Sequence, residues 1–258
     1  MTLRKQIITT IQTELEPLDF VNALWEGGSA AFDRVDQYSD IDLQIDVADA
    51  CVEHTFEAVE AALLKISPIK DKFRIPEPTW HGHSQCFYKL RDARDYLQID
   101  CAIIKTSSTD KFVQRELHGE PSVLFDKIGV IEQAAPFDWD AHNELLRERI
   151  TFLCERFERM QVYVEKEILR RHSIDVMGIF RPMTLDPIIE MLRIKHDPAR
   201  YNWGLRYLHH HLSLSDQARL TDLLYVQDLH ELAEKYKIAQ KWFWRLADEL
   251  KETYKEIQ

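Results

Sequence analysis

The sequence predicts an α+β protein, in which an N-terminal mixed sheet with flanking helices is followed by a C-terminal helical bundle. Up to residue 136, segments with the apolar alternation of strands are interspersed with segments that have helical spacing. Beyond that point, apolar residues recur every three or four positions, as they do on one side of a packed helix. We therefore expect two domains, residues 1–136 and residues 137–258.

In the first domain, helix and strand signals alternate along the chain. The expected elements are helices at 2–17, 29–36 and 49–65, and strands at 20–26, 40–47, 84–90, 95–104 and 123–126. The strands at 84–90 and 95–104 flank the polar stretch 91–94, which predicts a hairpin. The proline-bearing segment 67–78 is at best an edge strand, because proline cannot donate a hydrogen bond to a neighbouring strand.

The second domain is expected to begin just after Pro136, where Asp138 can cap a helix. Its apolar residues at intervals of four and three predict a long helix: Leu146, Ile150, Leu153, Phe157, Met160, Val164 and Ile168. Further helices are expected at 185–196, 215–234 and 238–256.

The composition is that of an ordinary globular chain, with 258 residues, 45% hydrophobic and 30% charged. Every apolar stretch falls short of the roughly 20 residues that cross a membrane. The N-terminal segment 1–19 lacks the apolar block of a signal peptide, so we expect a cytoplasmic protein. The four cysteines are far apart and show no Cys-x-x-Cys spacing, which predicts reduced thiols rather than a zinc site.

A formal net charge of −11 argues against a general nucleic-acid-binding protein, because binding a phosphate backbone relies on a basic face. Small polar or cationic partners suit this surface better, and the chain is expected to act as a monomer or a homodimer. A local basic face over residues 170–211 stays open as an alternative.

The most informative feature is the turn Gly27-Gly28-Ser29, which follows the apolar segment 20–25. The chain holds only seven glycines, so an adjacent pair indicates a demand on the backbone. Glycines allow close approach to a ligand, and the amides of a turn can form an anion-binding concavity. Gly28 and Ser29 are therefore candidate phosphate-binding residues, with the Ser29 hydroxyl adding to the cradle.

Asp40 and Asp42 lie on one face of the next expected strand. Apolar and polar residues alternate over 40–46, so Ile41 and Leu43 face the core and the two acids face away from it. Residues two apart on a strand are separated by roughly 6.5–7 Å, which lets two carboxylates share one divalent ion or a close pair of ions.

Asp100 lies on the polar face of a second strand with the same alternation, Tyr96 to Ile104. If this strand pairs with the one that carries Asp42, the two acids lie about 5 Å apart. At an effective dielectric near 20, two like charges at about that distance repel by about 3 kcal/mol. Three acids on one face are therefore expected to be neutralised by cations, and we interpret them as a magnesium site.

These residues resemble the nucleotidyltransferase fold of the DNA polymerase beta superfamily. The similarity is strongest to its small bacterial members, the minimal and the antibiotic (aminoglycoside- and lincosamide-type) nucleotidyltransferases. It rests on Gly28-Ser29, Asp40-Ile41-Asp42 and the later strand-borne acid, and covers residues 18–105. The helical remainder resembles the accessory domain of antibiotic-modifying members in general character only.

The resemblance implies a transferase with ATP or another nucleoside triphosphate as substrate and two Mg²⁺ ions as cofactors. Asp40 and Asp42 would hold the metals, and Gly28 and Ser29 would bind the terminal phosphates. Asp100 would be either the third metal ligand or the general base that takes the proton of the acceptor hydroxyl. A nucleoside monophosphate would pass to a small molecule, with an antibiotic as a reasonable acceptor class, and pyrophosphate would be released.

Three arginines are further candidates for nucleotide binding. Arg34 follows the turn closely enough to reach a phosphate, with an ordinary solvated helix residue as the alternative. Arg200 and Arg206 belong to the segment 200–207, where arginines could contact phosphates and aromatic rings could stack on a base. The alternative there is a helix junction.

Other polar residues near these motifs have a plainer interpretation. Asp46, farther along the strand of Asp42, is expected to be a surface acid. His81 and His83, with nearby Cys86, have the spacing of a metal cluster, but an ordinary polar loop is the favoured interpretation; either histidine could line an acceptor pocket.

Two other functions stay open. One is a nucleotide-binding regulatory or interaction protein without turnover, and the other is a nucleotidyltransferase that acts on a protein or an RNA end. Intact Gly28, Ser29, Asp40 and Asp42 argue against the first, and the acidic net charge argues against RNA.

Overall fold

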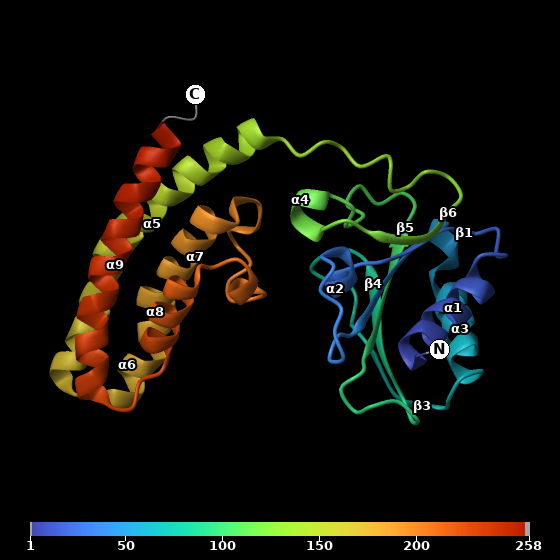
Figure 1. The fold of residues 1–258 in the computed structure, drawn as a ribbon, viewed down its shortest axis with the longest axis horizontal. Coiled ribbons are helices and arrows are strands. Elements are labelled where there is room, and N and C mark those ends of the chain that lie inside the picture. The colour runs from blue at the N-terminus through green and yellow to red at the C-terminus, as the bar shows by residue number, and fades with distance from the viewer. Residues whose placement is uncertain (1, 256–258) are drawn as a thin grey trace. The chain divides into compact units, whose positions relative to one another are not determined.

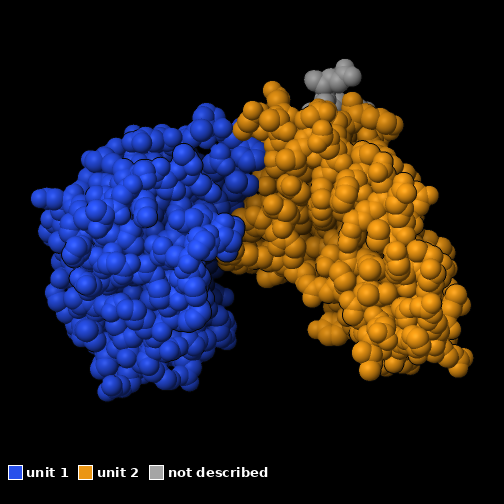
Figure 2. Space-filling model, turned by 180° about the vertical axis from the view of Figure 1, so that it is seen from behind, with its two compact units in different colours: residues 1–137 blue, residues 138–258 orange. Residues whose placement is uncertain are grey.

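The computed structural model describes residues 2–255. The chain divides into two compact units, residues 1–137 and residues 138–258, which are coloured separately in Figure 2. The first unit combines a mixed sheet with helices and the second is helical (Figure 1), so the α+β class expected from the sequence is confirmed.

The sheet of the first unit has six strands in the order β3-β4-β5-β2-β1-β6. β2 and β5 are parallel, and the other neighbours are antiparallel. The strands are β1 (Val21–Glu26), β2 (Ile41–Val47), β3 (Ile69–Arg74), β4 (Ser84–Leu90), β5 (Ile99–Lys105) and β6 (Ser122–Asp126). The expected β4–β5 hairpin is present, and the proline-bearing segment contributes the edge strand β3.

One face of the sheet is covered by helices α1 (Leu3–Leu15) and α3 (Val52–Leu64), as Figure 1 shows. The apolar alternates of the two central strands pack against these helices and are at most 1% exposed: Ile41, Leu43, Ile45, Ile99, Cys101 and Ile103. Because side chains alternate along a strand, this burial turns the intervening polar residues of β2 and β5 to the opposite face.

The opposite face carries a smaller apolar cluster that includes Trp25 and Ile104. The short helix α2 (Gly28–Ala31) follows β1 on this side, and α4 (Arg115–His118) lies close to it in the fold (Figure 1). The chain after α4 is fastened to α2, because the Glu120 amide donates to the Ala31 carbonyl at 2.8 Å. The helix that follows the glycine-containing turn is thereby anchored to the chain after α4.

The second unit contains α5 (Trp139–Arg170), α6 (Ser173–Phe180), α7 (Asp186–His196), α8 (Leu214–Leu224) and α9 (Leu229–Lys255). Asp138 caps α5 as expected, since its carboxylate accepts from the Ala141 amide at 2.9 Å. The predicted apolar positions of α5 face a shared core in which Phe157 stacks on Phe243 of α9, with ring centroids 3.7 Å apart.

The break before the last helix was predicted in the wrong place. It lies between α8 and α9 at residues 225–228, and not between 234 and 238. Asp228 begins α9 by accepting from the Glu231 amide at 2.8 Å, and the Glu231 carboxylate accepts from the Gln227 amide at 2.6 Å. The Asp-x-x-Glu pattern of residues 228–231 is a sequence signal for a helix start, and it outweighs the continuous apolar periodicity. The expected end of this helix at 256 lies outside the described residues.

Two other differences concern short elements. α2 has four residues instead of the expected 29–36, because Asp33 adopts a left-handed conformation with φ of 53° and turns the chain. The helices α4 and α6 were not predicted, and a π-helical turn at Arg181–Leu185 joins α6 to α7.

All four cysteines are free thiols, as expected, and Cys51 is the one that is partly exposed. None of the helices within residues 2–255 combines the length and the apolar character that crossing a membrane requires.

Candidate active site

The centre of the candidate site is a pair of aspartates on adjacent parallel strands. Asp42 of β2 and Asp100 of β5 are direct partners in the strand register, between the pairs Ile41–Ile99 and Leu43–Cys101. Neighbouring strands lie about 4.8 Å apart, so the two acids are side by side on the face away from α1 and α3. The strand pairing on which the prediction of Asp100 depended is therefore present.

Asp40 immediately precedes β2, at the same end of the sheet. Its side chain Oδ1 accepts from the Gln98 amide at 3.2 Å, and its backbone carbonyl accepts from the Arg4 guanidinium. Asp40, Asp42 and Asp100 are all partly exposed, so a solute can reach them.

The glycine turn packs directly against Asp42. The Gly27 amide donates to the Asp42 carbonyl at 2.8 Å, and Gly28 has a left-handed φ of 54°. A Cβ atom at Gly28 would lie 1.8 Å from the Asp42 Oδ2 atom, well inside any permitted contact. Only glycine fits here, for reasons of both backbone conformation and space.

Ser29 presents a hydroxyl that lacks a protein partner. Its Oγ atom is buried without a hydrogen bond within the described part of the chain, as is Oε1 of Gln44, which follows Asp42 on the same face of β2. An unpaired buried polar group is costly, so such atoms commonly bind a ligand or an ordered water. The role of the Ser29 hydroxyl in phosphate binding stays a prediction.

Sequence reasoning missed Glu26 and Arg4, which lie beside the acids. Glu26 is 6% exposed at the end of β1 and forms an ion pair with Arg4 of α1. Burial raises the pKa of Glu26; the Arg4 charge opposes this rise and the nearby Asp42 charge adds to it. Arg4 precedes Glu26 by twenty-two positions, and no local sequence pattern indicated that the two residues would form a pair.

Sequence reasoning also missed Gln85 of β4. Its side-chain amide donates to both carboxylate oxygens of Asp100, at 2.7 and 2.8 Å. Gln85 is thus a hydrogen-bond partner of both oxygens of the Asp100 carboxylate.

Solved structures include chains whose fold is similar to this one. A search of solved structures finds an aminoglycoside 6-adenyltransferase from Bacillus subtilis, at 12% sequence identity and a TM-score of 0.37. The match covers 96% of this chain and 89% of that one. No protein-family model matches the chain. No curated protein matches it either. At this identity and TM-score the match carries no functional argument, so the function is argued from the site itself.

Of the three candidate arginines, one belongs to the first unit and two belong to the second. Arg34 follows α2, where its amide donates to the Ser29 carbonyl at 2.9 Å and its guanidinium lies 5.2 Å from the Phe32 ring. Arg200 and Arg206 belong to the second unit. Arg200 forms an ion pair with Asp197 at 2.9 Å, which favours the helix-junction interpretation, and exposed Arg206 lies 5.2 Å from the ring centre of Trp203. Their roles in nucleotide binding stay predictions.

Asp46 was wrongly expected to be a surface acid. It is fully buried, and Lys111 forms an ion pair with it at 2.5 Å. Asn22 and Thr106 donate to the same carboxylate at 2.8 and 3.0 Å. Asp46 is therefore a structural residue that ties β2 to the chain after β5.

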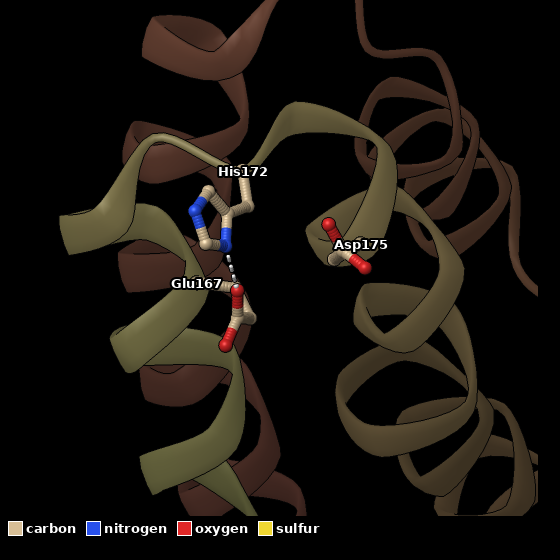
Figure 3. Close-up of side chains that lie close together, drawn as sticks. All are labelled: Glu167, His172 and Asp175. Carbon is tan, nitrogen blue, oxygen red and sulfur yellow. Dashed lines mark hydrogen bonds and ion pairs between the residues drawn. The ribbon is translucent and has the colours of Figure 1, made fainter.

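A second group of possible metal ligands lies in the helical unit, where α5 turns into α6 (Figure 3). Glu167, His172 and Asp175 each offer a ligand atom within 4.8 Å of the others. All three are at least partly exposed, and Glu167 already forms ion pairs with Arg170 at 2.5 Å and His172 at 2.8 Å. We assign no metal to this surface group.

Asp40, Asp42 and Asp100 do not form a group of that spacing in the described residues. Like charges on adjacent strands repel, so neutralisation by a cation is what would allow these carboxylates to approach a common point.

His81 and His83 belong to an ordinary loop before β4, as favoured from the sequence. Cys86, the third member of the suggested cluster, packs in the core on the helix-covered face. His83 is 3% exposed, neither of its ring nitrogens has a hydrogen-bond partner in the described chain, and its ring lies edge-on to Phe112 at 4.7 Å.

Burial of His83 predicts a loss of stability in acid. Burial and the nearby His81 lower the pKa of His83 from 6.5 to about 4. The folded chain therefore binds this proton less well than the unfolded chain, so stability is complete above pH 6.5 and falls as the pH drops toward 4. Between pH 7 and 4.5 we expect this residue to account for about 2 kcal/mol of lost unfolding free energy.

Urea titrations of the wild type and of His83→Leu at both pH values measure this contribution. The variant should lose about 2 kcal/mol less than the wild type on acidification. Equal losses in the two proteins would show that His83 is not the group responsible.

Proposed function

We propose that this chain is a Mg²⁺-dependent nucleotidyltransferase that transfers a nucleoside monophosphate, in the first instance AMP from ATP, to a hydroxyl group of a small molecule. The observation that carries the proposal is the in-register pair Asp42–Asp100, with Gly28 packed against the Asp42 carboxylate. Acids adjacent on a sheet face, next to a turn that only glycine can form, are suited to a metal-bound triphosphate.

The donor set fits Mg²⁺. Asp40, Asp42 and Asp100 offer carboxylate oxygens as possible ligands. Mg²⁺ prefers oxygen ligands and binds through a few carboxylates together with substrate phosphates. When bound, the metal would neutralise the phosphate charge and stabilise the entering and leaving oxygens.

In the proposed reaction, Gly28 and Ser29 bind the terminal phosphates and orient the leaving pyrophosphate. The acceptor oxygen forms a bond to the α-phosphorus while the bond from that phosphorus to the bridging oxygen breaks. The hydroxyl proton passes to Asp100 or to solvent, depending on whether Asp100 acts as base or as metal ligand. We assign catalysis to the first unit and acceptor binding to the second.

The acceptor is proposed to be a polar or cationic small molecule, with aminoglycoside and lincosamide antibiotics as the first classes to test. A net charge of −11 favours such partners over a nucleic acid.

Pyrophosphate release from ATP, measured with Mg²⁺ and a panel of hydroxyl-bearing acceptors, tests the proposal. Acceptor-dependent release, with the nucleotide recovered on the acceptor, would support it. Magnesium-dependent ATP binding without release on any acceptor would instead favour a nucleotide-binding protein without turnover.

A further inference from the structure

Asp100 lies at the end of a hydrogen-bonded chain that begins in the loop before β4. The His81 ring Nε2 is 3.0 Å from Oε1 of Gln85, and Nε2 of Gln85 lies 2.7 and 2.8 Å from the two carboxylate oxygens of Asp100. Gln85 is paired with Ala102 in the backbone register, so its side chain reaches diagonally to Asp100. Backbone pairing of β4 with β5 does not depend on this side chain.

The His81 ring is held in one hydrogen-bonding state by its own loop. The His83 amide donates to Nδ1 of His81 at 3.1 Å, so Nδ1 acts as an acceptor. In a neutral ring the proton is then on Nε2, which donates to Oε1 of Gln85. The loop is closed by Thr79, whose hydroxyl donates to the His83 carbonyl at 2.6 Å.

This arrangement gives the Gln85 amide a defined direction. Its oxygen faces the donor on His81, and its NH₂ group faces Asp100. A reversed amide would place an oxygen against the carboxylate and an N–H against the Nε2–H of His81, which are two repulsive contacts in place of two attractive ones.

We propose that Gln85 is a positioning residue for Asp100 and that His81 fixes the orientation of the Gln85 amide. Gln85 sets the rotation of the carboxylate beside Asp42, and in this way prepares Asp100 to act as the third metal ligand. The inference rests on the proposed function and deepens it, because it assigns the residues that prepare one of the three acids. Partners that orient a metal ligand typically change metal affinity by 10–100-fold when removed.

The test measures Mn²⁺ binding, by the loss of the free-ion electron paramagnetic resonance signal, in the presence of an ATP analogue with a methylene group between the α and β phosphorus atoms. Gln85→Leu should weaken Mn²⁺ binding about tenfold, and His81→Ala should weaken it in the same direction by a smaller factor. In an Asp100→Asn background, Gln85→Leu should add less than about a twofold change, because its effect passes through the carboxylate. A merely structural contact would weaken binding equally in both backgrounds.

Gln133→Leu is the matched control. Gln133 is an exposed glutamine in the same unit whose side chain donates to the Ile128 carbonyl at 3.1 Å, and the change should leave Mn²⁺ binding as in the wild type. If Gln85→Leu fails to fold, judged by circular dichroism, Gln85→Met replaces it. That variant keeps the length of the side chain but offers Asp100 no hydrogen-bond donor, so it should also weaken Mn²⁺ binding about tenfold.

The outcomes separate this inference from the proposed function. The positioning role alone is overturned if the wild type binds Mn²⁺ with the analogue and Gln85→Leu binds it equally well. It is also overturned if Gln85→Leu weakens Mn²⁺ binding as much in the Asp100→Asn background as in the wild type. A wild-type chain that does not bind Mn²⁺ with the analogue overturns both.

Discussion

Asp42→Asn is expected to reduce the rate of acceptor-dependent pyrophosphate release by about 10³-fold or more. The exchange keeps the size and shape of the side chain but removes the charge that would bind the metal, and the lost transition-state stabilisation of about 4 kcal/mol corresponds to about three powers of ten in rate. The measurement is steady-state pyrophosphate release at saturating Mg²⁺, with circular dichroism to verify that the variant is folded.

Asp95→Asn is the matched control for this prediction. Asp95 is an exposed acid of the same unit that forms an ion pair with Lys70 at 3.3 Å, so its neutralisation should leave the rate unchanged. Turnover of folded Asp42→Asn at the wild-type rate would remove Asp42 from the reaction.

Gly28→Ala should lower the same rate by about 100-fold and also destabilise the chain. The new Cβ would lie 1.8 Å from Oδ2 and 2.4 Å from Cγ of Asp42, so the carboxylate or the turn has to move by an ångström or more. Displacements of about 1 Å at a reacting centre can reduce rates by about 10²-fold. The left-handed backbone adds about 1 kcal/mol of strain to the folded state.

Gly129→Ala separates these two effects. Gly129 also has a left-handed φ, 74° against 54° at Gly28, but the nearest atom to a Cβ there is Oε2 of Glu132 at 4.0 Å. It should therefore show the backbone strain in a urea titration and retain full activity. Equal activity in the two alanine variants would show that the contact between Gly28 and Asp42 is unimportant.

The elements that the sequence predicted well are those whose pattern is local. The alternation around Ile41 and Leu43 requires Asp42 to face away from the core, and the same pattern applies to Asp100, so each acid could be placed on a strand face from its neighbours alone. The two strands are adjacent, parallel and in register, which is a property of the whole sheet. From the sequence, the closeness of Asp42 and Asp100 could be predicted only on the assumption that their strands pair.

The residues that sequence reasoning missed depend on contacts between distant parts of the chain. Gln85 reaches Asp100 across a strand boundary, and Arg4 reaches Glu26 from a helix. Asp46 was misjudged for the same reason: its burial depends on Lys111, sixty-five positions later, and a buried carboxylate is tolerated only with such a partner. No local periodicity carries that information.

The most direct test of the central claim is a crystal structure with Mn²⁺ and the methylene analogue of ATP. The account predicts an anomalous Mn²⁺ peak in contact with the carboxylates of Asp42 and Asp100, and the triphosphate against Gly28 and Ser29. A nucleotide bound away from this face of the sheet, or manganese found only at the surface group Glu167, His172 and Asp175, would contradict it.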